Sequence, residues 1–183
     1  MTKQNANART LSRRAAITTV AAAPLAGQFS VGLAASDEVA QLVQRAAAKN
    51  AAFMRGDMDG WLALVHIAPD FTLMQPFGGP TSHGFDASPG RLAELSRFFK
   101  NGETTLDVVQ TYASDRLIVL VMLERQQAEV GGLPNQNWSL RVTEVYRKDD
   151  SEWRLVHRHA DPLVSGITLQ EAATLARGGR KNE

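Results

Sequence analysis

The sequence predicts an α+β domain in which a curved antiparallel sheet wraps around N-terminal helices to form a cone with an internal pocket. Two observations support this fold class. Three helical patterns occur before residue 101, and strand patterns joined by short turns follow from residue 104 to residue 161. Helices that precede such strands pack on one face of an antiparallel sheet. A strongly curved sheet with a helix against its concave side encloses a pocket for a small molecule.

Composition is that of an ordinary globular domain, with 44% hydrophobic and 21% charged residues among 183. Residues 1–35 contain four basic residues and no acid, so the remainder has 16 basic and 19 acidic residues, a net charge of −3. A mildly acidic body without a basic stripe gives no electrostatic reason to bind nucleic acid. The absence of cysteine excludes disulfides and cysteine nucleophiles.

The N-terminal 35 residues have the order of an export signal, with a basic start followed by an uncharged run of small residues. "SRRAAI" at residues 12–17 resembles the twin-arginine motif, and the run is too weakly apolar for a stable membrane span. We expect cleavage near Ala34 or Ala35 and a periplasmic or secreted protein. The alternative is a disordered tail on a cytoplasmic protein. The expected domain then covers residues 36–163, and residues 164–183 form a short helix and a polar tail.

The first elements of this domain are two helices. Apolar residues recur at helical spacing through residues 36–55, with acids near the start and Gly56 at the end. Asp57 is placed to cap a short second helix over residues 58–65, which ends before Pro69.

A strand and a third helix follow. Residues 70–79 predict a strand closed by a proline and a glycine pair, and a loop comes after it. Ser88 supplies an N-cap and Pro89 the first helical turn of a helix that continues through residues 91–100. Asn101 and Gly102 are expected to terminate it.

Strand patterns dominate the second half of the domain. Their connections, Ser114-Asp115, "GGLPNQ" and "KDDSE", are rich in turn-forming residues. Thr168 and Glu171 have the spacing of a capping box and predict a short final helix. The expected strands span residues 104–112, 116–129, 138–147 and 153–161.

Two histidines two residues apart in the last strand are the strongest candidates for chemistry. Strand alternation places His157 and His159 on the same face as Trp153, Leu155 and Asp161. Each histidine can act near pH 7 as acid, base or hydrogen-bond donor, and Asp161 can orient one of them. We expect at least one to project into the cone. The alternative is that a histidine packs at the edge of the core and Asp161 ends the strand.

Three further residues are candidates for the pocket. If Arg141 points inward, its planar guanidinium suits a carboxylate or enolate oxygen of the ligand; the alternative is a solvated position. Glu124 follows a long apolar run and would be a base if it lies inside the pocket, or a solvated strand end otherwise. Trp61 is expected to be pocket wall or core.

Three stretches carry a resemblance to a known superfamily. "AAFMRGDMDGWLALV", "DFTLMQPFGG" and "WSLRVTEVYRKDDSEWRLVHRHADP" resemble the SnoaL-like and ketosteroid-isomerase-like branches of the nuclear transport factor 2-like superfamily, over about residues 36–163. The resemblance implies the cone fold, a homodimer formed through the convex face of the sheet, and an inward Arg141. It implies no single activity, since isomerases, cyclases, dehydratases, epoxide hydrolases and binding modules share the fold.

The sequence departs from the ketosteroid isomerases at two positions. Their general base is an acid just before the proline that closes the first strand, where this chain has Gln75. Their oxyanion-hole tyrosine from the first helix corresponds in spacing to Lys49. Since glutamine cannot accept a proton at neutral pH, the steroid-isomerase mechanism is not carried over. We expect Gln75 and Lys49 to contact the ligand instead.

No cofactor is expected, because the sequence has no phosphate loop and no dinucleotide fingerprint. A metal on the His-x-His pair would need a third ligand such as His83, and no fixed ligand spacing supports one. The favoured function is an exported domain that binds a small apolar ligand carrying oxygen. Its catalytic form would be cofactor-free acid–base chemistry of the isomerase, cyclase or dehydratase type. The alternative is a non-catalytic ligand-binding or dimeric assembly module.

Overall fold

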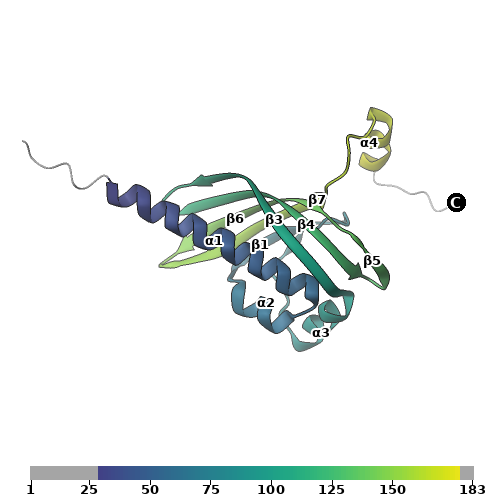
Figure 1. The fold of residues 1–183 in the computed structure, drawn as a ribbon, viewed down its shortest axis with the longest axis horizontal. Helices are drawn as coiled ribbons and strands as arrows, with labels where there is room; N and C mark the ends of the chain where they lie inside the picture. The colour runs from purple at the N-terminus through teal and green to yellow at the C-terminus, as the bar shows by residue number, and fades with distance from the viewer. Residues whose placement is uncertain (1–28, 178–183) are drawn as a thin grey trace, which may run out of the picture.

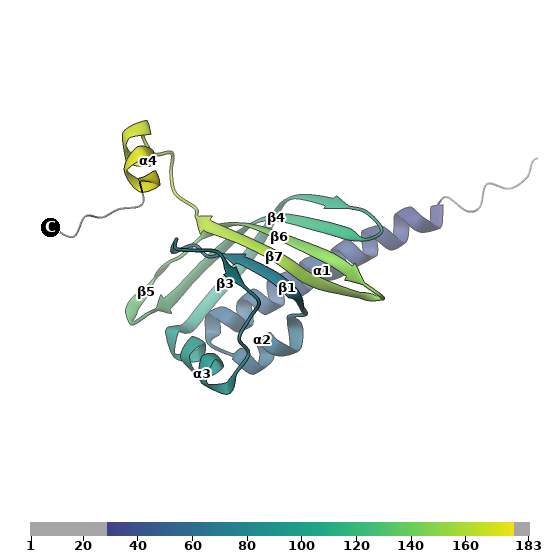
Figure 2. The same cartoon turned by 180° about the vertical axis from the view of Figure 1, so that it is seen from behind.

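The computed structural model describes residues 29–177 and has the predicted α+β architecture. A long helix lies across the concave face of a curved, unclosed sheet, and two short helices cover one end of the same face (Figure 1). Figure 2 shows the other face of the sheet without a helix over it. The expected export signal falls largely outside the described residues. None of the helices within residues 29–177 has the length and apolarity needed to cross a bilayer.

The helices begin and end largely where local sequence signals place them. Helix α1 (Phe29–Arg55) starts before the expected residue 36 and ends at Gly56, whose φ of 79° is left-handed. A side chain at Gly56 would also meet the carbonyl oxygen of Phe99 at 2.5 Å. In α2 (Met58–Leu64), the N-cap carboxylate of Asp57 accepts from the amide of Gly60 at 2.9 Å.

Two later helices also have the predicted caps. Helix α3 (Pro89–Phe98) has Ser88 as its N-cap and proline in its first turn. It ends before the expected residue 100, because Phe99 and Lys100 instead pair with the neighbouring strand. Helix α4 (Leu169–Ala176) begins with the predicted capping box of Thr168 and Glu171.

The sheet has seven strands in the order β2-β1-β7-β6-β4-β3, with β5 paired to β4. Pairing is antiparallel except between β1 and β7, which are parallel, so the expectation of a purely antiparallel sheet is wrong at that pair. The long chain between β1 and β7 makes a parallel pair possible. The strands are β1 (Ile67–Met74), β2 (Ser82–His83), β3 (Phe99–Ala113), β4 (Leu117–Val130), β5 (Leu133–Asn137), β6 (Leu140–Asp149) and β7 (Glu152–Pro162).

Strand β5 was not expected, because the sequence "GGLPNQ" was predicted as a connection. Gly131 and Gly132 both have positive φ, 61° and 86°, and Val130 pairs with Leu133 across them. Two such glycines form the tight hairpin turn that matches the twist of paired strands. The chain therefore folds back on β4 and extends the sheet at the end that also carries α3.

The core lies between α1 and the concave face of the sheet. On β4 and β6 the even-numbered residues face this core, as the alternation of buried and exposed residues shows. Along α1 the buried side chains are apolar at Leu42 and Ala46, polar at Lys49 and Asn50, and apolar again at Ala52 and Met54. The main buried cluster includes Leu42, Ala46, Trp61, Phe71, Ile118, Leu120, Met122, Val142, Tyr146 and Leu155.

Candidate functional site

A cavity of about 420 Å³ lies between α1, α2, α3 and the concave face of the sheet. This volume falls within the range of small-molecule sites in proteins. Its walls are mostly apolar, and five polar side chains meet at its inner part. The apolar wall includes Phe53, Met54, Trp61, Val65, Phe71, Phe85, Leu95 and Leu140, and the inner polar residues are Lys49, Asn50, Glu124, Gln126 and Arg158.

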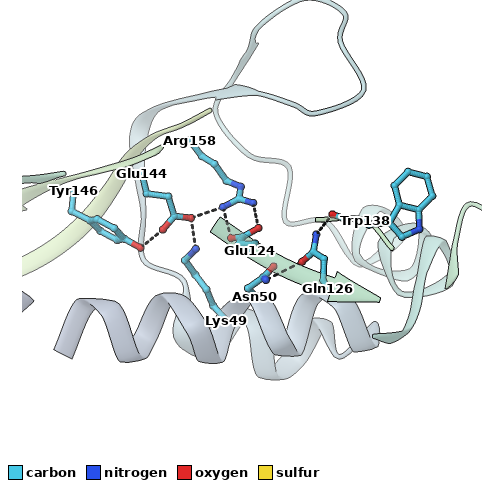
Figure 3. A network of polar contacts seen from close by, with 8 residues as sticks. All are labelled: Lys49, Asn50, Glu124, Gln126, Trp138, Glu144, Tyr146 and Arg158. Carbon is cyan, nitrogen blue, oxygen red and sulfur yellow. Dashed lines mark hydrogen bonds and ion pairs between the residues drawn. The ribbon is translucent and has the colours of Figure 1, made fainter. Parts of the chain in front are cut away.

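Two of these side chains, Lys49 and Arg158, are held by the carboxylate of Glu144, which is fully buried on β6 and does not itself line the cavity. It accepts hydrogen bonds from Lys49 Nζ at 2.5 Å, from Tyr146 Oη at 2.6 Å and from Arg158 at 2.8 Å. Lys49 reaches it from α1, whereas the other partners come from the sheet, as Figure 3 shows. The network therefore joins the helix to the sheet by buried charged groups.

Arg158 connects this carboxylate to the cavity. Its guanidinium donates to both carboxylate oxygens of Glu124, at 2.9 and 2.7 Å, and to Glu144. Glu124, which is 1% exposed, lines the cavity, as do Lys49 and Arg158. We call Lys49, Arg158, Glu124 and Glu144 the buried quartet, which contains two cations and two carboxylates. Burial of charge is tolerated only when partners and hydrogen bonds compensate it, and here they do.

The surroundings fix the protonation states of the quartet's centre. Burial alone would raise the pKa of Glu144, but the charges of Lys49 and Arg158 and the hydrogen bonds from Lys49 and Tyr146 lower it to about 2. Burial and the adjacent Glu144 carboxylate raise the pKa of Tyr146. Burial would lower the pKa of Arg158, yet Glu124 and Glu144 raise it. At neutral pH Glu144 is ionised, Arg158 is charged and Tyr146 is a neutral donor.

A second, uncharged arm continues along α1 and β4. Asn50 donates through Nδ2 to Gln126 Oε1 at 3.0 Å, and Gln126 donates to the backbone oxygen of Trp138 at 3.1 Å (Figure 3). Asn50 and Gln126 are buried and line the cavity beside the charged quartet. The inner end of the cavity therefore offers both hydrogen-bond donors and acceptors within an otherwise apolar space.

Aromatic side chains border the outer end of the cavity. Phe77, 54% exposed, lies 6.0 Å from Trp138 and 6.4 Å from Phe98 between ring centroids. Gln75 lies beside them, where its amide donates to the backbone oxygen of Gly78 at 3.0 Å. We call Phe77, Phe98 and Trp138 the aromatic rim. The rim leaves apolar surface exposed at the cavity mouth.

Half of the residues predicted to contact a ligand do line the cavity. Glu124 and Lys49 belong to the buried quartet, Trp61 forms part of the apolar wall, and Gln75 lies near the mouth. Lys49 therefore projects from the first helix into the cavity wall, as expected. Lys49 contacts Glu144 there, a partner that the sequence had not suggested.

The expectations that at least one of His157 and His159 projects into the cone, and that Arg141 points inward, are wrong. Arg141 lies on the opposite face of β6, exposed and paired with Asp161. His159 is exposed, and His157 bonds Thr72 through Nδ1 at 2.7 Å. None of these residues lines the cavity.

A β-bulge explains the error for the two histidines, whereas Arg141 lies on the regular strand β6, where the resemblance and not the alternation had placed it inward. Val145 pairs with His157 while the next residue of β6, Tyr146, pairs with Leu155, so Val156 is an extra residue in β7. Such an insertion reverses the alternation beyond it. Trp153 and Leu155 remain inward, as expected, but after the bulge Arg158 points inward and the histidines point outward.

His83 also lies away from the cavity, in β2, where it pairs with Thr72 of β1. Across the described part of the chain, no three His, Asp or Glu side chains are grouped to hold a metal ion.

Sequence reasoning missed Arg158, Glu144 and Tyr146 as site residues. A usable signal existed for the pairing of Lys49 with Glu144. Lys49 falls on the apolar stripe of the first helix, and Glu144 occupies an inward position between Val142 and Tyr146. A cation and an anion on two apolar faces of one domain are expected to meet, since neither is buried without a partner.

Comparisons with known proteins agree with this architecture. A family model described as a SnoaL-like domain matches residues 39–165. A search of curated proteins finds no match to the sequence. Among solved structures, a putative dehydratase of the NTF2-like family from Streptomyces avermitilis aligns with a TM-score of 0.57 and 20% identity, over 71% of this chain and 99% of that one.

Two other solved structures are similar to a comparable degree. An NTF2-like superfamily protein from Salmonella enterica serovar Typhimurium has a TM-score of 0.56 and 17% identity, over 75% of this chain and 98% of that one. An NTF2-like protein of unknown function from Pseudomonas putida has a TM-score of 0.53 and 20% identity, over 76% and 92%. At these identities the likeness shows the fold.

Proposed function

Because the chain belongs to the SnoaL-like domain family, we propose that it binds an uncharged, mostly apolar small molecule in the cavity between α1 and the sheet. The observation that carries the proposal is an apolar cavity whose inner end is a charge-balanced polar group. Apolar walls with a few polar groups at one end are typical of small-molecule sites. The aromatic and aliphatic wall would hold the body of the ligand, and the polar end would fix its orientation.

Charge balance supports an uncharged ligand. Lys49 and Arg158 already neutralise Glu124 and Glu144, so a ligand carboxylate or ammonium would add a buried net charge. A buried charge without a partner is strongly unfavourable. A carbonyl or hydroxyl oxygen adds none, and it can still form hydrogen bonds at the polar end.

Donors and acceptors remain for such an oxygen. The Lys49 ammonium has three N–H groups. Within residues 36–177 one of them donates to Glu144, which leaves two for a ligand. Glu124 accepts two hydrogen bonds from Arg158, while an ionised carboxylate has about four acceptor positions. A ligand carbonyl would therefore accept from Lys49, and a ligand hydroxyl would donate to Glu124.

Cofactor-free acid–base catalysis is the second candidate function. It is favoured by the presence of a carboxylate, Glu124, and an ammonium group, Lys49, on the wall of one cavity. Proton abstraction by Glu124 beside a polarised carbonyl would be chemistry of the isomerase or dehydratase type. Arg158 holds both carboxylate oxygens of Glu124 in a bidentate pair, which fixes Glu124 in place as a hydrogen-bond acceptor and favours binding over catalysis.

The proposal also includes a homodimer and export. Outward side chains on β4 and β6, among them Val119, Val121 and Val145, form an apolar area on the face of the sheet that Figure 2 shows without a helix. Tyr112 at the edge of this area is 60% exposed. A second copy of the same face would cover it. Export rests on the sequence pattern of residues 1–35 alone.

The uncharged dye Nile red tests ligand binding directly, because its fluorescence rises in apolar surroundings. Val65→Trp would fill the cavity and abolish the rise, whereas Leu62→Trp on the exposed side of α2 would leave it intact. Displacement of the dye by naphthalene derivatives tests the ligand class. We expect the ketone and the alcohol to displace it at concentrations about tenfold below the carboxylate or the amine, a difference of about 1.4 kcal/mol. Equal displacement by all four would contradict an uncharged ligand.

A further inference from the structure

Helix α4 has an apolar side that no other part of residues 29–177 covers. Leu169 is 79% exposed, Leu175 is 73% exposed, and Ile167 in the preceding segment is 46% exposed. Figures 1 and 2 show the helix standing clear of the sheet. Isolated helices shorter than about 12 residues are marginal in water, and α4 has eight residues. The capping box of Thr168 and Glu171 nevertheless stabilises the start of this helix, which favours a helix that packs on another surface.

An exposed apolar surface lies next to the start of the segment that leads to α4. A groove of about 260 Å³ shares Pro76, Phe77, Trp138 and Leu140 with the wall of the cavity. The lining of the groove also includes Leu163 and Val164, the first residues after β7. The groove is therefore continuous with the aromatic rim, and the connecting segment already lies in it.

The connection is short enough to keep α4 near the rim. The amide of Leu163 donates to the backbone oxygen of Ser139 at 2.8 Å, which anchors the segment beside Trp138. The five residues from Val164 to Thr168 span at most about 17 Å when fully extended. Such a tether gives the chain's own helix a local concentration at the rim in the millimolar range.

We propose that α4 is a lid that folds over the mouth of the cavity and packs its apolar side on the aromatic rim. Leu169 and Leu175 would cover Phe77 and Phe98, which are themselves exposed by 54% and 43%. The polar side, with Gln170 and Thr174, would then face solvent. This inference rests on the proposed function, since a lid matters only if the cavity takes a ligand. Its expected effect is slower release of that ligand.

Cross-linking tests closure without any ligand. The chain has no cysteine, so pairs can be introduced into an otherwise unreactive protein. We expect a short bismaleimide to join Ala172→Cys on α4 with Arg97→Cys beside Phe98 within one chain. The control pair, Ala172→Cys with Asp115→Cys, places the second cysteine in the turn at the far end of β3 and should not react internally. Products only between chains, or equal yields from both pairs, would overturn the lid.

Dye release tests the consequence of closure. Leu169→Glu with Leu175→Glu should raise the dissociation rate of Nile red at least about tenfold, or about 1.4 kcal/mol. Thr174→Glu, on the polar side of the same helix, should leave the rate unchanged. Because α4 contributes no residue to the buried core, opening the lid should lower the unfolding midpoint only slightly, and Thr174→Glu should leave it unchanged. An unchanged rate in the double variant would contradict the lid.

The two outcomes separate the lid from the cavity. If Nile red does not bind the unmodified protein, the proposed ligand site fails, while the cross-link still reports whether α4 closes. If the dye binds but the internal cross-link does not form, the lid fails and the ligand site stands.

Discussion

Arg158 and Glu124 form a bidentate ion pair on the wall of an apolar cavity, with both carboxylate oxygens within 2.9 Å of the guanidinium. Arg158 also contacts Glu144, so one guanidinium links two carboxylates on different strands. Lys49 supplies the balancing charge from α1. The fold at this end of the cavity therefore depends on charge balance as well as on apolar packing.

Replacement of Glu124 by glutamine should destabilise the protein strongly. The change leaves two buried cations facing the single carboxylate of Glu144. Breaking a buried ion pair on one side typically costs about 3–5 kcal/mol. Urea denaturation measures the loss. As a control, Asp107→Asn removes the partner of Arg125 in an exposed pair and should cost less than about 1 kcal/mol. Similar losses in the two variants would contradict a buried, charge-balanced network.

A compensating change sharpens this prediction. Lys49→Met in the Glu124→Gln background restores the balance, since Arg158 and Glu144 remain as a pair. The double variant should therefore be more stable than Glu124→Gln alone, and the two effects should not add. If Lys49→Met lowers the free energy of unfolding by the same amount in the Glu124→Gln background as in the unmodified protein, charge balance does not determine the stability of this network.

Acid should unfold the protein through Glu144. Its pKa is lowered from 4.5 to about 2 in the folded state, because Lys49 and Arg158 outweigh the effect of burial. A lowered folded-state pKa contributes stability that is complete above pH 4.5 and is lost as the pH falls toward 2. The contribution is about 3 kcal/mol, from about 1.4 kcal/mol per pKa unit. Denaturation curves between pH 6 and pH 2 measure it.

Salt separates this contribution from that of exposed acids. Asp70 and Asp149 bond Arg147 at the surface, and hydrogen bonds from Arg147 lower the pKa of each. At about 0.5 M salt the screening length is about 4 Å, so exposed pairs should weaken while the buried one persists. If high salt removes the whole acid dependence, the exposed acids rather than Glu144 would account for it.

Much of the fold was predictable because its signals are local. Caps at Asp57, Ser88 and Thr168, and the alternation along β4 and β6, each depend on residues close in sequence. The hairpin at Gly131-Gly132 was also readable, since a glycine pair between two runs of residues is a turn signal. It was missed because "LPNQ" contains proline and polar residues, which are uncommon in strands.

The candidate site was harder to predict because it depends on non-local pairing. A single extra residue, Val156, decides whether Arg158 or His157 faces the cavity, and nothing in the sequence around it marks a bulge. The partners of Glu144 come from one helix and two strands, which only the assembled sheet brings together. The alternation of side chains therefore predicted the inward residues of β4 correctly, because its pairing with β6 is regular. It predicted the wrong inward residues of β7 after the bulge at Val156.

A homodimer through the open face of the sheet should be visible in solution. Val121 lies outward on β4, two residues along from Val119, whose neighbours across the sheet are Val145 and Tyr112. Val121→Glu should convert a dimer to a monomer in light scattering while leaving the unfolding midpoint of the monomer unchanged. Gln127→Glu, further along the same strand, should leave the mass unaltered. A monomer mass for the unmodified protein across the micromolar range would remove the prediction.

Export should depend on the arginine pair. If "SRRAAI" directs translocation, protein from the native cell should lack the N-terminal segment and begin near Ala35 or Ser36. Arg13→Lys with Arg14→Lys should retain the full-length chain in the cytoplasm, because a twin-arginine signal needs both guanidinium groups. Mass spectrometry of cell fractions gives the answer. An intact Met1 on the soluble cytoplasmic protein would argue against export.

Ligand affinity should depend on the cavity face of the sheet and not on its outer face. Arg141→Ala and His159→Ala remove exposed side chains across the sheet from the cavity, so each should leave the dissociation constant of a naphthalene ketone within about twofold. Lys49→Met with Glu124→Gln keeps the charge balance but removes the Lys49 ammonium, the proposed donor to a ligand carbonyl, so it should weaken the ketone about tenfold or more, the usual effect of a lost buried hydrogen bond. The same double variant should bind naphthalene itself as before, because the apolar wall is unchanged. Loss of affinity in the Arg141 or His159 variants would instead place the ligand on the outer face and refute the cavity as the binding site.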